Sequence, residues 1–265
     1  MKYIVQEQEH GLDNPHREGL HHIGNSTHWI VFDGVKILTD PWLAEPAEHM
    51  LIHSIPPIPL PIDPDIVLIS HEHDDHFDPE ALSRLDKAAF VVAPEGKVAD
   101  AVEKMNFSEL YRAKPEDSIE VRGVIIDVVK GKHNVPELCY RVKSKDNSFF
   151  FGGDSMVTKE IEQMADQEPV PFVILPGEYS SILGFRFVMT PEEAVLLASR
   201  FRAKQAVLTH HEQLNVGAWW FRWLVRINKV PNSKFPDWFS VPKPGDYVQF
   251  PWDQNNYESK EAAIN

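Results

Sequence analysis

The stretch "ISHEHDDHFD", from Ile69 to Asp78, concentrates imidazole and carboxylate groups in a few positions. It follows the apolar run Ile66-Val67-Leu68, which predicts a short buried strand. Neutral imidazole and carboxylate are good ligands for zinc and similar divalent ions. The stretch therefore predicts a metal site on the turn after this strand. The alternative interpretation is a solvated acidic turn whose histidines are incidental.

The spacing inside this stretch suits two ions better than one. His71 and His73 share one face of an extended chain, because side chains alternate along a strand. Asp75 and His76 follow where the chain turns, so they are expected to face a second ion. All of these ligands cannot comfortably reach a single ion.

Further ligands must come from distant segments, and polar residues stand where other predicted strands end. His133 ends "DVVKGKH", Asp154 follows two glycines in "FFFGGDS", and His210 and His211 end "AVLTHH". Strand ends at one edge of a sheet are a usual place for a site. Each residue alone has an ordinary structural explanation. Together with the histidine-rich stretch they predict one centre.

The elements that must position these residues are hairpins followed by β-α units. Alternation around Asp33-Gly34 predicts a β-hairpin over residues 27–42. A proline-rich segment, residues 43–64, predicts a long extended loop. The pattern predicts helices over residues 78–86, 96–106, 190–203 and 217–227. It predicts further strands over residues 65–70, 88–94, 123–131, 138–144, 148–154, 171–177 and 205–210.

Two of the predicted helices carry starting signals. Asp78 is a predicted N-cap followed by proline. Thr190 and Glu193 have the spacing of a capping box. Two mixed β-sheets with helices outside accommodate this order of elements. We assign residues 1–265 to a single domain with a C-terminal aromatic extension over about residues 216–265.

Composition narrows the class of protein. The chain has 265 residues, is 43% hydrophobic and has a formal net charge of −14. No basic run is visible, so we expect no nucleic-acid partner. The single cysteine, Cys139, excludes an internal disulfide and a cysteine-based zinc cage, and it is expected to be a buried thiol. The sequence contains no apolar run of membrane-spanning length and no secretory signal, so we expect a cytoplasmic protein without integral membrane association.

The combined pattern resembles the metallo-β-lactamase superfamily of binuclear hydrolases: His-x-His-x-Asp-His, a lone His, Gly-Asp and a late His. The resemblance runs from about His22 to Leu214. The segments "PPIPLPIDPDIVLISHEHDDHFD" and "MTPEEAVLLASRFRAKQAVLTHHEQ" are similar to the branch with ascorbate-6-phosphate lactonase-like and N-acyl-phosphatidylethanolamine phospholipase D-like proteins. The resemblance to this superfamily implies an α/β fold, namely a four-layer αββα sandwich of two mixed β-sheets.

The resemblance also implies a ligand set. His71, His73 and His133 match the ligands of the first ion. Asp75, His76 and His210 match those of the second, and Asp154 matches the bridging carboxylate. His210 is preferred to His211 because it directly follows "AVLT". A set without thiolate suits zinc, with manganese or iron as alternatives.

Such a centre would be hydrolytic. Two ions ~3.5–4 Å apart bridge a water and lower its pKa, which gives a hydroxide nucleophile. Asp75 is predicted to orient this hydroxide or carry its proton. Arg186 is a candidate for an anionic substrate group, and Tyr179 for an oxyanion or leaving-group contact. Trp219, Trp220 and Trp223 permit a homo-oligomer interface.

Three functions remain open from the sequence. The leading one is a small-molecule hydrolase, lactonase-like. The others are a phosphodiesterase acting on a lipid or nucleotide, and a non-catalytic metal-binding or sensing protein. Two departures bear on this choice: branch members often have Gly-His where this chain has Gly24-Asn25, and His-Met where it has Val188-Met189. Both positions are expected to lie near the substrate.

Overall fold

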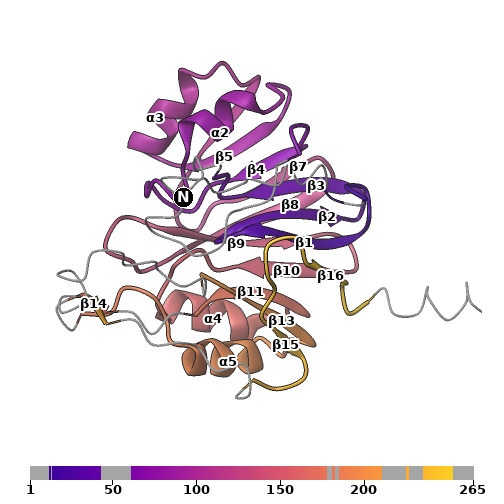
Figure 1. Cartoon of the computed structure of the whole chain (residues 1–265), viewed down its shortest axis with the longest axis vertical. Helices are drawn as coiled ribbons and strands as arrows, with labels where there is room; N and C mark the ends of the chain where they lie inside the picture. Colours follow the sequence, from indigo (N-terminus) through magenta and orange to yellow (C-terminus); the bar gives the residue numbers. More distant parts are fainter. Residues whose placement is uncertain are drawn as a thin grey trace, which may run out of the picture.

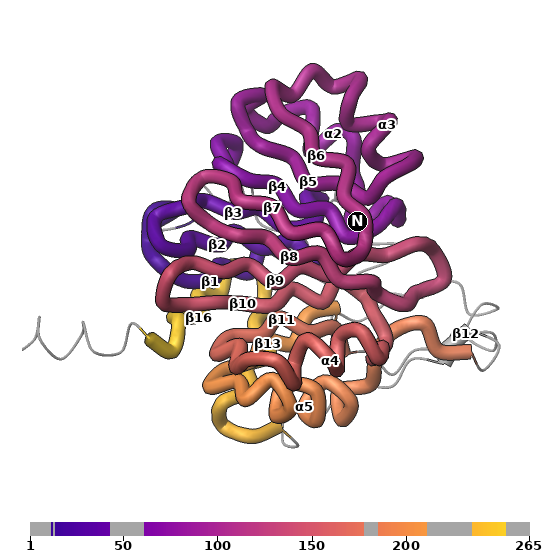
Figure 2. The backbone as a smooth tube through the Cα atoms, turned by 180° about the vertical axis from the view of Figure 1, so that it is seen from behind, coloured from indigo at the N-terminus to yellow at the C-terminus, as the bar shows by residue number. Residues whose placement is uncertain are grey.

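Two seven-stranded β-sheets pack face to face, with helices on both outer surfaces (Figure 1). The computed structural model describes residues 12, 14–42, 61–177, 181–182, 185–210, 225–226 and 235–252. Helices α2 and α3 cover the first sheet, and α4 and α5 cover the second, so the layers run αββα (Figures 1 and 2). The predicted fold class is confirmed.

The first sheet has the strand order β16-β1-β2-β3-β4-β5-β6. Strands β16, β1, β2 and β3 are antiparallel, whereas β3 to β6 run parallel, so the sheet is mixed. Its members are β1 (Gly19–Gly24), β2 (Thr27–Phe32), β3 (Val35–Thr39), β4 (Ile66–Leu68), β5 (Phe90–Pro94), β6 (Glu109–Ala113) and β16 (Tyr247–Val248).

The second sheet has the order β15-β13-β11-β10-β9-β8-β7. It is antiparallel from β7 to β10 and parallel from β10 to β15. Its members are β7 (Ser118–Val121), β8 (Val124–Lys130), β9 (Leu138–Lys143), β10 (Ser148–Phe151), β11 (Phe172–Pro176), β13 (Gln205–Thr209) and β15 (Phe239–Ser240). Strands β12 (Ser181–Ile182) and β14 (Val225–Arg226) form a separate small ladder.

The helices are α2 (Pro79–Arg84), α3 (Lys97–Glu103), α4 (Lys159–Gln167) and α5 (Pro191–Arg200). Asp78 caps α2 through a bond from the Glu80 amide, as predicted. Thr190 and Glu193 form the predicted capping box of α5. Helix α4 was not predicted, because its short apolar stripe is set in a strongly polar segment. No helix in the described ranges is long and apolar enough to cross a membrane.

The largest core lies between the sheets and is rich in aromatic side chains. Phe32 packs edge-on against Phe149 and Phe250 there. Fully burying one such ring contributes ~1.5–3 kcal/mol. Tyr140, which is also fully buried in this core, donates a hydrogen bond from its hydroxyl to the Ile69 carbonyl at 2.6 Å. This bond ties the second sheet to the chain that leaves β4.

All of the predicted strands are present, and two differences from the prediction have physical reasons. Strand β1 was missed because "GLHHIG" looks polar, although all six of its residues are buried. The predicted helix over residues 217–227 is wrong at Val225 and Arg226, which form β14. Aromatic and β-branched residues favour strands as readily as buried helices. The rest of that helix, and residues 43–60 of the predicted loop, lie outside the described residues. Cys139 is a buried free thiol, as predicted.

Candidate metal centre

Four turns bring the predicted ligands to one edge of the two sheets. His71, His73, Asp75 and His76 lie between β4 and α2, and His133 lies between β8 and β9. Asp154 follows β10, and His210 directly follows β13. Strands β4, β10 and β13 each present their carboxyl end here, which is where sites of α/β sheets usually form.

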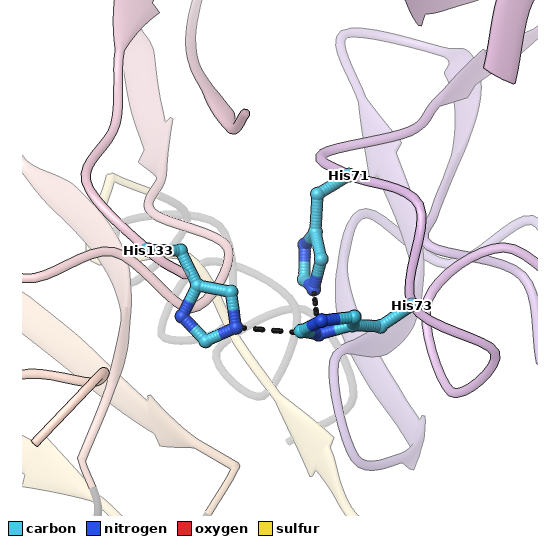
Figure 3. Close-up of side chains that lie close together, drawn as sticks. All are labelled: His71, His73 and His133. Atoms are coloured by element: carbon cyan, nitrogen blue, oxygen red, sulfur yellow. Dashed lines mark hydrogen bonds between the residues drawn. The ribbon is translucent and has the colours of Figure 1, made fainter. Parts of the chain in front are cut away.

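The first group consists of three histidines (Figure 3). His71 and His73 project from the β4–α2 segment, and His133 faces them from the β8–β9 loop. The His73 Nδ1 lies 3.0 Å from the His71 Nε2 and 3.2 Å from the His133 Nε2. A tetrahedral zinc ion with Zn–N bonds of 2.0–2.1 Å separates its nitrogens by roughly 3.3 Å. The spacing therefore suits one divalent ion.

The second group surrounds Asp154. Its Oδ2 lies 3.2 Å from the Nε2 of both His76 and His210. The Oδ2 of Asp75 lies 3.7 Å from the same two nitrogens. Asp75, His76 and His210 are thus close enough to hold one ion.

Two buried atoms fit a cation in this place. The His76 Nε2 is buried and makes no hydrogen bond within the described part of the chain, although Asp154 Oδ2 is near. The Asp154 Oδ1 is likewise buried without a partner there. Buried polar atoms nearly always have partners. An ion facing both lone pairs would supply them, so the residues present fit divalent metal ions.

Asp40 is linked by hydrogen bonds to two of the predicted histidine ligands. Its carboxylate accepts hydrogen bonds from the Ser70 amide at 2.7 Å, the Ser70 hydroxyl at 2.6 Å and the His76 Nδ1 at 2.7 Å. Because the Ser70 hydroxyl donates to Asp40, its oxygen accepts from the His71 Nδ1 at 2.9 Å. Both histidines therefore carry a proton on Nδ1 and turn Nε2 toward the centre. Asp40, His71 and His76 also lie within ligand distance of one another, but these bonds explain that grouping without an ion.

Glu137 is a second buried acid that contacts predicted ligands of this centre. Its fully buried Oε1 accepts from the Asp154 amide at 2.6 Å and lies 3.5 Å from the His71 Nδ1. Gly153, at φ +53°, lets the chain pass: a Cβ there would come within 2.6 Å of this oxygen. Burial and the charge of Asp154 raise the pKa of Glu137 well above its ordinary value.

Burial and charge separate the pKa values of the histidines. Burial lowers the pKa of His71 well below its usual range, and it also lowers the pKa of His133. Burial also acts to lower the pKa of His76, but the carboxylates of Asp154 and Asp75 outweigh it and raise this pKa well above the ordinary value. The pKa of Asp154 is held well below its usual range, since the nearby histidines outweigh its burial.

A known family of domains matches most of the chain. The family model described as a beta-lactamase superfamily domain matches residues 19–210. The chain belongs to the β-lactamase superfamily. The matched range begins at β1 and ends at His210, so it contains every predicted metal ligand.

Individual members of the superfamily are only distantly similar. A UPF0173 metal-dependent hydrolase of Methanopyrus kandleri is 24% identical over 208 residues, which is 71% of this chain and 82% of that protein. The mitochondrial N-acyl-phosphatidylethanolamine-hydrolyzing phospholipase D of Saccharomyces cerevisiae is 38% identical over 66 residues, 23% of this chain and 14% of that protein. The crystal structure of isothiocyanate hydrolase from Delia radicum gut bacteria superposes with a TM-score of 0.70 at 20% identity, covering 88% and 98% of the two chains.

Of the two residues predicted to contact substrate, one lies in the described part of the chain. Arg186 is 43% exposed and forms a two-pronged ion pair with Glu193, at 3.0 and 3.2 Å. The neighbouring Phe187 carbonyl accepts a hydrogen bond from the His133 Nδ1 at 2.9 Å. The segment that carries Arg186 thus orients a predicted metal ligand. Tyr179, His211 and the tryptophans at 219, 220 and 223 lie outside the described residues.

The two departures from the branch pattern lie beside the centre of this superfamily member. Asn25 is fully buried, and its amide donates to the Oδ2 of Asp75 at 3.1 Å. Val188 is also buried and follows the Phe187 carbonyl that binds His133. Asn25 therefore contacts a predicted metal ligand directly, and Val188 follows a residue that contacts one.

Asp40 and Glu137 were not among the predicted site residues. Asp40 follows β3 just as His71 follows β4, so the search for polar residues at strand ends could have found it. Glu137 sits in the loop "NVPEL", where no pattern distinguishes it from a surface acid.

Proposed function

We propose that the protein is a binuclear metal-dependent hydrolase, with zinc as the expected metal, acting on small-molecule substrates in a lactonase-like reaction. The main support for this proposal is that seven side chains from four turns lie close together: His71, His73, Asp75, His76, His133, Asp154 and His210. The name of the Methanopyrus kandleri relative, a metal-dependent hydrolase, supports the reaction class.

Each part of the centre has a task in this proposal. Bound ions would supply a hydroxide nucleophile and polarise the substrate oxygen. Asp154 would help to hold both ions: its Oδ2 faces His76 and His210 of the second group, and its buried Oδ1 makes no hydrogen bond within the described residues. Asp75 would orient the nucleophile or carry its proton. Asp40 keeps the Nε2 lone pairs of His71 and His76 turned toward the centre.

Recognition of substrate is assigned to the α5 side of the centre. Arg186 would bind an anionic group by exchanging its partner Glu193 for the substrate, which its 43% exposure permits. Tyr179 would contact the oxyanion or the leaving group. A substrate held there would lie beside His133, because Phe187 links the two.

The test is metal analysis combined with a substrate panel. Purified protein should contain close to two ions per chain and hydrolyse lactones, and chelation should abolish turnover. His73→Ala should remove hydrolysis, whereas Asn134→Ala, an exposed residue next to His133, should keep it. Full activity in chelated protein would refute the proposal.

A phosphodiesterase is the second candidate. The local similarity to the yeast phospholipase D favours it. Bis-p-nitrophenyl phosphate and an N-acyl-phosphatidylethanolamine vesicle, measured beside a lactone series, distinguish the two by the larger kcat/KM. Tight binding of two ions with no turnover on the whole panel would favour the third possibility, a metal-binding or sensing protein.

A further inference from the structure

Asn25 stands on a turn that its neighbours fix in place. The residue lies between β1 and β2, has φ +51° and is fully buried. On one side the Thr27 hydroxyl donates to the Asp40 carbonyl at 2.6 Å, and the Thr39 hydroxyl donates to the Ser26 carbonyl at 2.9 Å. The turn is thus bonded to the end of β3, which also carries the Asp40 carboxylate.

The amide of Asn25 holds Asp75 at two points. Its Nδ2 donates to the Asp75 Oδ2 at 3.1 Å and to the Asp75 carbonyl at 3.3 Å. Both acceptors lack protons, so the NH₂ end of the amide must face them. The contact joins residues 50 positions apart in the sequence.

These two hydrogen bonds fix the direction of one carboxylate oxygen of Asp75. Asp75 lies in a series of turns whose neighbour Asp74 is exposed, so local secondary structure does not fix its side chain. With Oδ2 bound to Asn25, it lies at equal distances of 3.7 Å from the Nε2 of His76 and His210. Asn25 therefore places Asp75 at the second group of predicted ligands.

Few residues can do this at position 25. A positive φ favours glycine, asparagine, aspartate and histidine, and the imidazole of histidine titrates near neutral pH. Glycine has no donor, and aspartate would set a second carboxylate against Asp75. Asparagine accepts the backbone conformation and supplies a neutral donor that does not titrate.

We propose that Asn25 is a positioning residue that holds Asp75 for the second metal ion and so sets the affinity of that ion. The inference rests on the proposed function, in which Asp75 is a ligand of this ion. Loss of a group that orients a metal ligand typically costs 10–100-fold in affinity. The first ion, held by His71, His73 and His133, should be unaffected.

The experiment measures zinc binding to metal-free protein by calorimetry. Asn25→Gly keeps the positive φ available and removes only the amide. We expect two binding events in the wild type, and in this variant a second event weakened about 10–100-fold with an unchanged first event. Asn106→Gly is the matched control, since Asn106 has φ +58° but is exposed and lies just before β6, at the opposite end of the parallel strands from the predicted ligands. It should bind zinc like the wild type.

Two further measurements separate positioning from a structural effect. The metal-free Asn25→Gly variant should melt within a few degrees of Asn106→Gly, and excess zinc should restore its hydrolysis. Should Asn25→Gly fail to fold, Asn25→Asp keeps the size and backbone of the residue and should lose the second ion more severely.

The outcomes are distinguishable. A wild type with two ions and an Asn25→Gly or Asn25→Asp variant of equal affinity would overturn the inference alone. A wild type that binds fewer than two ions would overturn the proposed function and the inference with it.

Discussion

His76 donates from Nδ1 to the Asp40 Oδ2 at 2.7 Å, and both side chains are fully buried. This bond determines that His76 turns Nε2 toward Asp154 and His210. The same carboxylate reaches His71 through the Ser70 hydroxyl. One acidic residue that touches neither predicted ion position thus sets the tautomers of two predicted ligands, one from each group.

Asp40→Asn should therefore weaken metal binding strongly while keeping the shape of the side chain. The amide has one acceptor oxygen where Asp40 serves three donors, so at least one bond is lost. We expect a 10–100-fold loss of zinc affinity, comparable to that of other residues that orient metal ligands. Calorimetry on metal-free protein checks this, with Asp33→Asn in the exposed β2–β3 turn as control. Unchanged affinity for both ions would contradict the tautomer argument.

Proton release should differ between the two ions. At pH 7 His71 is neutral, because its pKa is lowered by burial, so the first ion should release no proton from it. His76 has a pKa raised above the ordinary 6.5 and is charged in the metal-free protein, so the second ion should displace about one proton. Calorimetry in buffers of different ionisation enthalpy measures both numbers. Release of a proton with the first ion only would contradict the assignment.

The raised pKa of His76 also makes the stability of the metal-free protein depend on pH in a defined direction. A raised folded pKa means that the charged His76 stabilises the metal-free fold fully below pH 6.5, its unfolded value. That contribution is lost as the pH rises through the folded pKa. His76→Ala should remove this part of the pH dependence of the metal-free melting temperature.

Tyr140→Phe should destabilise the fold without touching a predicted ligand. The variant removes the buried 2.6 Å bond to the Ile69 carbonyl and leaves that acceptor without its donor. The expected cost is about 1–3 kcal/mol in the free energy of unfolding. Urea unfolding of metal-free protein measures it. Tyr111→Phe, at a partly exposed position of β6, is the control and should cost less; equal costs would refute the importance of this bond.

Arg186→Ala tests substrate recognition. If the guanidinium binds an anionic group, KM should rise about tenfold for an anionic lactone and stay constant for a neutral one, since one hydrogen bond to a charged group is worth ~1.5 kcal/mol. Arg202→Ala, an exposed arginine after α5, should change neither. Equal effects on both lactones would leave Arg186 a purely structural partner of Glu193.

The grouping of the predicted ligands was easier to predict than their surroundings. His71, His133, Asp154 and His210 come together at one edge of the two sheets because each follows a buried strand, and strand ends are visible in the sequence as changes from apolar to polar residues. That these residues bind metal stays a prediction. The hairpin at Asp33-Gly34 and the capping box at Thr190 were predictable because both depend on residues a few positions apart.

Contacts between distant residues were not predictable. The bond from Asn25 to Asp75 joins two turns that no local pattern relates. Glu137 lies against Gly131 and Gly153, where an added Cβ would come within 3.0 and 2.6 Å of its side chain. Val225 and Arg226, which belong to the predicted helix over residues 217–227, pair with β12 instead. Their partners lie more than 40 positions earlier, so no local pattern reveals this pairing.

Anomalous diffraction from crystals grown with zinc would locate the ions themselves. We expect two peaks about 3.5–4 Å apart, one within bonding distance of His71, His73 and His133, the other of Asp75, His76 and His210, with Asp154 between them. A single peak, or two peaks with Asp154 bound to neither, would contradict the proposed binuclear centre.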